Sequence, residues 1–169
     1  DMRLSDILSK NKSALLDMWF EVMLKAYPAD TAVFMRDQKK QFANPVGYTM
    51  SHELEKILSG LLSNAEIKSL TPHLENIIKI RAVQGLMPSQ ALSFVFLLKD
   101  IIRGQIRGDM SVKEHELKEI ELRIDSLALL AFDLFMACRE KIYELKASEA
   151  RNMTYRLLQK AKLVCEVEG

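Results

Sequence analysis

The chain has 169 residues, 49% of them hydrophobic and 28% charged, which is typical of one folded domain and excludes an intrinsically disordered chain. Its 24 basic and 23 acidic side chains leave a net charge of +1. A balance so close to zero gives no overall field that would hold the protein on nucleic acid or on an anionic membrane.

Apolar runs and cysteines indicate a cytoplasmic protein. The N-terminal residues 1–12 are charged throughout and contain no apolar core of signal-peptide length. The longest nearly apolar run, 127–138, is too short to span a bilayer and contains Asp133. The two cysteines, Cys138 and Cys165, fit a reducing compartment better than a disulfide framework. We therefore expect a cytoplasmic location and no membrane span.

Helical signals follow one another along the first part of the chain. Apolar side chains recur at helical spacing over 15–26, and Tyr27-Pro28 ends that segment. A short helix is expected over 31–37. No window shows the sustained alternation of a strand between turn signals, so the sequence predicts an all-α protein.

The next helix has a clear start. Asn44 is a strong N-cap and Pro45 suits the first helical position, so a helix begins there and runs to about Leu62. Gly47, in its first turn, is not explained by capping. A glycine there costs about 1 kcal/mol relative to alanine unless another backbone or a ligand comes close.

Two more helix starts marked by proline follow further along the chain. Thr71-Pro72 opens a helix that Gly85 ends, and Met87-Pro88 opens another that loosens at Gly104. Ser111 and Glu114 form a capping-box pattern before the longest helix, expected over 112–145.

The longest helix is apolar on nearly every side between 127 and 138. Its main stripe advances mostly in alternating steps of four and three residues. The sequence therefore predicts the central, buried helix of the bundle, packed on more than one face, in which an unpaired Asp133 would be costly.

The last segment differs in charge. Residues 151–162 carry Arg151, Arg156, Lys160 and Lys162 and no acidic side chain. We predict a single-domain bundle of about six or seven helices, with a globin-like arrangement as one alternative. Residues 1–145 form the bundle, and residues 146–169 form a helical extension that relays a signal or docks on a partner or a second protomer.

Catalytic and metal-binding motifs are not evident. His52 lies in HELEK, where a zinc-protease helix would need a second histidine at the position of Lys56. We expect His73 and His115 to be solvated. A haem needs an axial side chain facing an apolar pocket, and none of the histidines lies on an apolar face, whereas ligation by Met or Cys stays open. With no nucleophile elbow and no phosphate-binding glycine loop, the sequence predicts no enzyme and no cofactor.

A few polar features admit two interpretations. Arg81 and Gln84 lie three residues apart beside the stop at Gly85, and Arg139 and Tyr143 lie four apart on one helix face. Salt bridges and caps that tie helix ends together are one interpretation, and a ligand pocket is the other. The candidate ligand-binding residues are Asn44, Gly47, Arg81, Gln84, Arg139 and Tyr143.

The pocket interpretation leads to an alternative function. In a small-molecule or haem-binding globin-like protein, the helix start at Asn44 would face an anionic group, with Arg81 or Arg139 as the counter-charge.

Three blocks of the sequence carry a family resemblance. FANPVG at 42–47, the block at 80–103 and the block at 132–149 resemble the RsbRD N-terminal domain family, which is similar in role to the input domains of sigma-B stressosome co-antagonists. The order and spacing of the blocks carry the resemblance, which covers nearly the whole chain. Leu86 and Met87 depart from the family pattern, in which an aromatic residue and then Ser or Thr often precede the proline.

The resemblance implies a non-catalytic, all-helical sensory or regulatory domain. Such domains pair as homodimers and pass a signal through a C-terminal helix to a protein partner or to their own output domain. We therefore expect a cytoplasmic regulatory domain that acts by helix rearrangement or protein–protein interaction.

Overall fold

The computed structural model describes residues 3–37, 42–107 and 114–163. Within these ranges the chain forms seven α-helices and one 3-10 helix and no strand, which confirms the all-α prediction. No helix in the described ranges combines the length and the apolar character needed to cross a membrane. The expected capping box at Ser111 and the second cysteine, Cys165, lie outside the described residues.

The helices follow the proline signals closely. The elements are α1 (Leu4–Lys10), α2 (Lys12–Leu24), α3 (Ala29–Arg36), α4 (Pro45–Leu62), the 3-10 helix η1 (Ile67–Leu70), α5 (Thr71–Val83), α6 (Pro88–Gln105) and α7 (Glu114–Lys160). Pro45, Pro72 and Pro88 each occupy the first turn of a helix, where the missing N–H has no intrahelical partner to lose.

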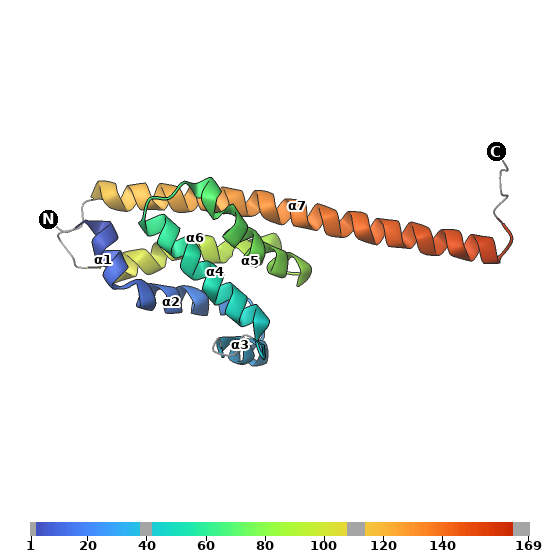
Figure 1. Ribbon diagram of the computed structural model, residues 1–169, viewed down its shortest axis with the longest axis horizontal. Coiled ribbons are helices and arrows are strands. Elements are labelled where there is room, and N and C mark those ends of the chain that lie inside the picture. The colour runs from blue at the N-terminus through green and yellow to red at the C-terminus, as the bar shows by residue number, and fades with distance from the viewer. Residues whose placement is uncertain (1–2, 38–41, 108–113, 164–169) are drawn as a thin grey trace.

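The first six helices gather along one half of α7, and the other half projects far beyond them (Figure 1). Helices α5 and α6 make the most extensive packing on α7, and α4 touches it more lightly. Behind them, α2 packs on α6 and α4, and α3 packs on α4. Helix α7 is therefore an edge of the bundle against which the other helices are assembled.

An aromatic pair lies at the centre of the bundle. The ring of Trp19 is fully buried and lies 6.0 Å from the ring of Phe94, centroid to centroid. The indole Nε1 of Trp19 donates a hydrogen bond of 2.7 Å to the carbonyl oxygen of Phe94. This bond joins α2 to α6 inside the core, where an unpaired N–H would be costly.

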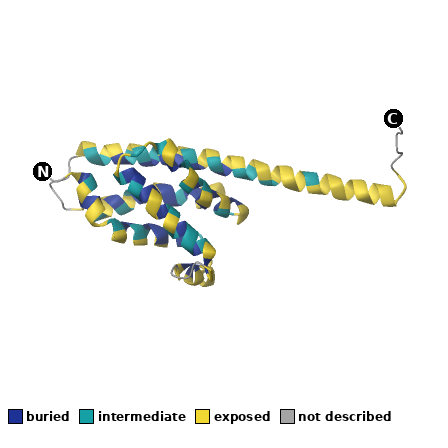
Figure 2. Cartoon of the chain, in the orientation of Figure 1, coloured by how far each residue is buried: buried dark blue, intermediate teal, exposed yellow. Residues whose placement is uncertain are grey.

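The prediction that α7 is packed on more than one face is wrong. Buried side chains of α7 form a single stripe, Ile120, Ile124, Leu127, Ala128, Ala131 and Phe135. Leu129 is 69% exposed and Phe132 49% exposed. Asp133 is exposed too, so it carries no burial cost. The run is apolar on two faces, but the described chain covers only one of them (Figure 2).

Packing along α7 stops well before the helix does. Ile142 is the last α7 residue packed on the core, and Tyr143 to Lys160 is almost wholly exposed (Figure 2). The helix nevertheless continues without interruption to Lys160. Leu, Lys, Ala, Glu and Arg together make up 11 of the 18 residues in this stretch, and these residues have high helix propensity without tertiary contacts.

We predict that Trp19→Phe lowers the free energy of unfolding by about 1–3 kcal/mol, because it removes the buried hydrogen bond and part of the ring. Urea denaturation followed by circular dichroism measures the change. Phe34→Leu, at a side chain that is 57% exposed, is the control and should stay within about 0.5 kcal/mol of the unmodified protein. An equal loss in both variants would contradict a special role for Trp19.

Candidate functional site

The side chain of Asn44 joins two helix ends. It is buried, and its Oδ1 accepts a hydrogen bond of 3.0 Å from the backbone N–H of Gly47. Its Nδ2 donates to the carbonyl oxygens of Phe34, Met35 and Asp37 at 3.0, 3.1 and 3.1 Å. One amide group therefore caps the start of α4 and the end of α3 together.

Gly47 makes room for this junction. A Cβ at this position would lie 2.4 Å from the carbonyl oxygen of Met35 and 2.4 Å from Nδ2 of Asn44. The close approach of the α3 backbone therefore explains the glycine that capping alone left unexplained. The start of α4 therefore faces the side chain of Asn44 and the backbone carbonyl of Met35.

We predict that Gly47→Ala destabilises the fold by about 1–3 kcal/mol, because the new methyl group must displace a backbone carbonyl. Thermal unfolding is a suitable measurement. Gly104→Ala is the matched control: a Cβ there meets nothing within 4 Å, and alanine should leave stability unchanged or raise it by up to about 1 kcal/mol. A Gly47→Ala protein as stable as the control would show that the junction is looser than the structure has it.

Arg81 is fully buried near the C-terminal end of α5. Its Nε donates to the carbonyl oxygen of Ala91 at 2.7 Å, and its Nη2 donates to that of Gln90 at 2.8 Å. The guanidinium carbon lies 5.5 Å from the centre of the Tyr27 ring and 5.4 Å from that of Phe94. These partners are carbonyl groups and ring faces. The positive charge of Arg81 is therefore stabilised by neutral acceptors and cation–π contacts instead of by a carboxylate.

Gln84 and Tyr27 complete the cluster around Arg81. The hydroxyl of Tyr27 donates a 2.6 Å hydrogen bond to Oε1 of Gln84 and accepts one of 3.4 Å from Nη1 of Arg81. Burial raises the pKa of Tyr27, an effect that the positive charge of Arg81 partly offsets. Burial also lowers the pKa of Arg81 from its ordinary value. The cluster connects α5, the start of α6 and the turn after α2.

Arg139 and Tyr143 lie nearby on the surface of α7. Nη2 of Arg139 donates to the hydroxyl of Tyr143 at 2.7 Å, and Nη1 donates to the carbonyl oxygen of Ala82 at 3.4 Å. The guanidinium also lies over the Tyr143 ring, 5.1 Å from its centre. The structure thus places the pairs Arg81–Gln84 and Arg139–Tyr143 at the same end of α5, whereas Asn44 and Gly47 belong to the α3–α4 junction.

We predict that Arg81→Ala destabilises the protein by about 2–4 kcal/mol, since it leaves a cavity and removes partners from Tyr27 and two carbonyls. Arg139→Ala, at a half-buried position on the surface, should cost less than about 1 kcal/mol. Chemical denaturation of the two variants side by side checks the difference. Comparable losses in both would contradict the assignment of Arg81 as the buried connector.

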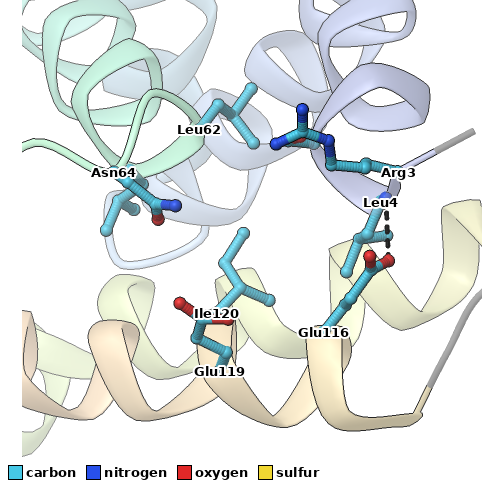
Figure 3. A pocket seen from close by; sticks show the side chains of 9 residues that line it. Arg3, Leu4, Leu62, Asn64, Glu116, Glu119 and Ile120 are labelled. Atoms are coloured by element: carbon cyan, nitrogen blue, oxygen red, sulfur yellow. Dashed lines mark hydrogen bonds between the residues drawn. The ribbon is translucent and has the colours of Figure 1, made fainter.

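A small polar pocket lies where the chain begins and α7 starts. Its volume is about 170 Å³, and its lining includes Arg3, Asn64, Glu116 and Glu119 (Figure 3). The backbone N–H of Leu4 donates a 3.0 Å hydrogen bond to Oε2 of Glu116, shown as the dashed line in Figure 3. The sequence gives no local signal for this pocket, because its lining residues come from three distant parts of the chain.

Two apolar grooves flank α7. One lies between α6 and α7 and is lined by Pro88, Ser89, Leu92, Ser93, Phe96, Leu97 and Phe132. The other lies between α5 and α7 and is lined by Glu75, Lys79, Val83, Leu134, Ala137, Cys138, Lys141 and Ile142. Burial raises the pKa of the Cys138 thiol, which keeps the thiol protonated at neutral pH. Both grooves are surfaces on which another helix could pack.

The histidines lie apart from these grooves. The side chain of His73, which the sequence suggests is solvated, is 35% exposed, and its Nδ1 lies 2.6 Å from Oε2 of Glu53. The two side chains come from helices α5 and α4, and only tertiary packing brings them together. His52 stacks on Tyr48 with a ring separation of 6.0 Å. The described residues contain no group of three or more His, Cys, Asp or Glu side chains that could hold a metal ion.

The fold and the surface features define an all-helical domain whose exposed apolar surface is concentrated along one long, projecting helix. The chain belongs to the family of the RsbT co-antagonist protein RsbRD N-terminal domain, whose family model matches residues 13–150. The family is regulatory, so this chain is a regulatory domain. No curated protein and no solved structure matches the chain.

Proposed function

We propose that the protein is a non-catalytic, cytoplasmic, stressosome-type regulatory domain that passes a signal on through protein–protein contacts of α7. The observation that carries this proposal is the uncovered apolar face of the helix. Leu122, Leu129 and Phe132 are 57%, 69% and 49% exposed, although each is large and apolar. Several large apolar side chains exposed along one helix of a regulatory domain indicate a protein interface.

A homodimer is the simplest assembly that covers this face. The exposed Phe96 and Leu97 of α6 extend the apolar surface next to Phe132. Each 100 Å² of apolar surface that pairing removes from water contributes about 2.5 kcal/mol before the entropy cost of association. Membership of a regulatory family supports a partner that is itself a protein, either a second copy, a separate regulator or an output domain.

The packing of α7 supports a relay. Helices α5 and α6 both lie against it, and Arg139 of α7 donates a hydrogen bond to the carbonyl of Ala82 in α5. A signal that favours a different packing of α5 or α6 would therefore move α7 as one rigid helix. We propose that Arg139 and Tyr143 serve this connection between bundle and rod.

We predict that Leu129→Lys converts a dimer into a monomer while helicity and melting temperature of the monomer stay close to normal. The new charge is solvated in the monomer but would be buried in the interface. Sedimentation equilibrium measures the association constant. Val33→Lys is the control, because Val33 is 64% exposed on α3, away from α7, and its replacement should leave association unchanged.

An unmodified protein that remains monomeric at high micromolar concentration would contradict the homodimer. A Leu129→Lys protein that dimerises normally would place the interface away from α7. In either case, affinity capture with the unmodified protein and with the Leu129→Lys variant would still test the regulatory role. Partners that bind the exposed apolar face of α7 should be captured by the unmodified protein and lost from the variant.

A further inference from the structure

The small polar pocket at the start of α7 brings charges of both signs to one place. Its lining includes one cation, Arg3, and two anions, Glu116 and Glu119. Among the described residues, the guanidinium of Arg3 forms no ion pair, and the carboxylate of Glu119 has no hydrogen-bond or ion-pair partner. These charges therefore remain available to a molecule that enters the pocket.

Helix geometry places the two carboxylates together. Glu116 and Glu119 are three residues apart, so they lie on one face of α7 beside the buried side chain of Ile120. The hydrogen bond from the N–H of Leu4 uses Oε2 of Glu116 and holds the first helix against α7. The other oxygen of Glu116 and both oxygens of Glu119 can only accept, because an ionised carboxylate has no donor.

Hydrogen-bond donors come from the other two segments of the lining. The guanidinium of Arg3 can donate two parallel hydrogen bonds to one carboxylate. Asn64 follows the end of α4 with a φ of 57°, a left-handed conformation that asparagine tolerates well, and its side-chain amide lines the pocket. The side chains of Arg3, Asn64 and Glu116 surround the space above Ile120 (Figure 3).

Apolar side chains form the remainder of the lining: Leu4, Leu61, Leu62 and Ile120. The pocket volume is about 170 Å³, and a cavity of about 150 Å³ in another protein is large enough to bind benzene. The pocket therefore has room for an apolar group of about four to six carbon atoms beside the charged side chains.

We infer that this pocket binds a small zwitterion, an α-amino acid with an apolar side chain of the size of leucine. The carboxylate of the amino acid accepts hydrogen bonds from Arg3 and Asn64. Its ammonium donates to Glu116 and Glu119, and its side chain packs on Ile120. A purely cationic ligand would be repelled by Arg3, and a purely anionic one would be repelled by the two glutamates, so a molecule with both charges is the best complement.

The bound amino acid contacts the start of α1, the end of α4 and the first turns of α7 at once. Binding therefore favours the folded arrangement of these three segments and raises the melting temperature with ligand concentration. The inference goes beyond the proposed function and depends neither on the exposed apolar face of α7 nor on the homodimer.

Isothermal titration calorimetry of the full chain with L-leucine tests the inference, and thermal unfolding with and without L-leucine gives a second measurement. We expect saturable binding to the unmodified protein. Arg3→Gln and Glu119→Gln should each weaken it by about tenfold or more, because each removes one charge-assisted contact. Asp133→Asn is the matched control, because Asp133 is exposed on α7 outside the pocket, and it should leave the affinity unchanged.

Two analogues of leucine test the need for both charges. Isocaproate keeps the side chain and the carboxylate of leucine but lacks the ammonium. Isoamylamine keeps the side chain and the ammonium but lacks the carboxylate. Each analogue should bind at least about tenfold more weakly than leucine. An analogue that binds as tightly as leucine would overturn the assignment of a zwitterion.

The remaining results separate this inference from the proposed function. No heat and no thermal shift with millimolar leucine, valine or methionine would overturn the inference and leave the α7 interface intact. Leucine binding that persists unchanged in both Arg3→Gln and Glu119→Gln would overturn the assignment to this pocket. Circular dichroism confirms that each variant keeps its helices.

Discussion

The geometry of the whole molecule depends on a mismatch of helix lengths. Helix α7 has 47 residues and is about 70 Å long, whereas the longest helices that pack near it, α4 and α6, have 18 residues and are about 27 Å long. A bundle of short helices can cover only part of such a rod. The rest must project, and its side chains face water or another protein. The bundle and the projecting segment are therefore connected by one continuous helix, α7.

The buried stripe of α7 fixes where the bundle forms. Its small members, Ala128 and Ala131, allow neighbouring helices to approach closely, and Phe135 closes the end of the stripe. Beyond Ile142 no neighbouring helix is present among the described residues, and the burial of the rod ends within one turn. A change in how α5 or α6 packs on this stripe would move the rod as a unit, which suits a regulatory domain.

Polar side chains give the bundle its specific connections. Arg81 is a buried cation whose acceptors are carbonyl oxygens in the first turn of α6, and Asn44 bridges the end of α3 and the start of α4. Misplacing either helix would leave these polar groups without partners inside the core. Such groups therefore select one arrangement of helices, while apolar burial supplies most of the stability. Hydrophobic packing alone would tolerate several arrangements.

The sequence by itself determined the local structure. Asn44-Pro45, Pro72 and Pro88 set the helix starts because capping and the fixed φ of proline act within a few residues. The prediction of a long last helix was confirmed for the same reason. The resemblance of three sequence blocks indicated the family, which the match over residues 13–150 confirmed.

Only the tertiary structure decided which partners distant residues have. Periodicity indicates that the middle of α7 is apolar on more than one side but cannot tell which side the chain covers. Leu122, Leu129 and Phe132 stay exposed because the neighbouring helices pack on the other side. Tyr27 as a partner of Arg81, Glu53 as a partner of His73, and the approach of Met35 to Gly47 were likewise not evident. These contacts join residues far apart in the chain, and their energies depend on burial and distance, which exist only once the helices have packed.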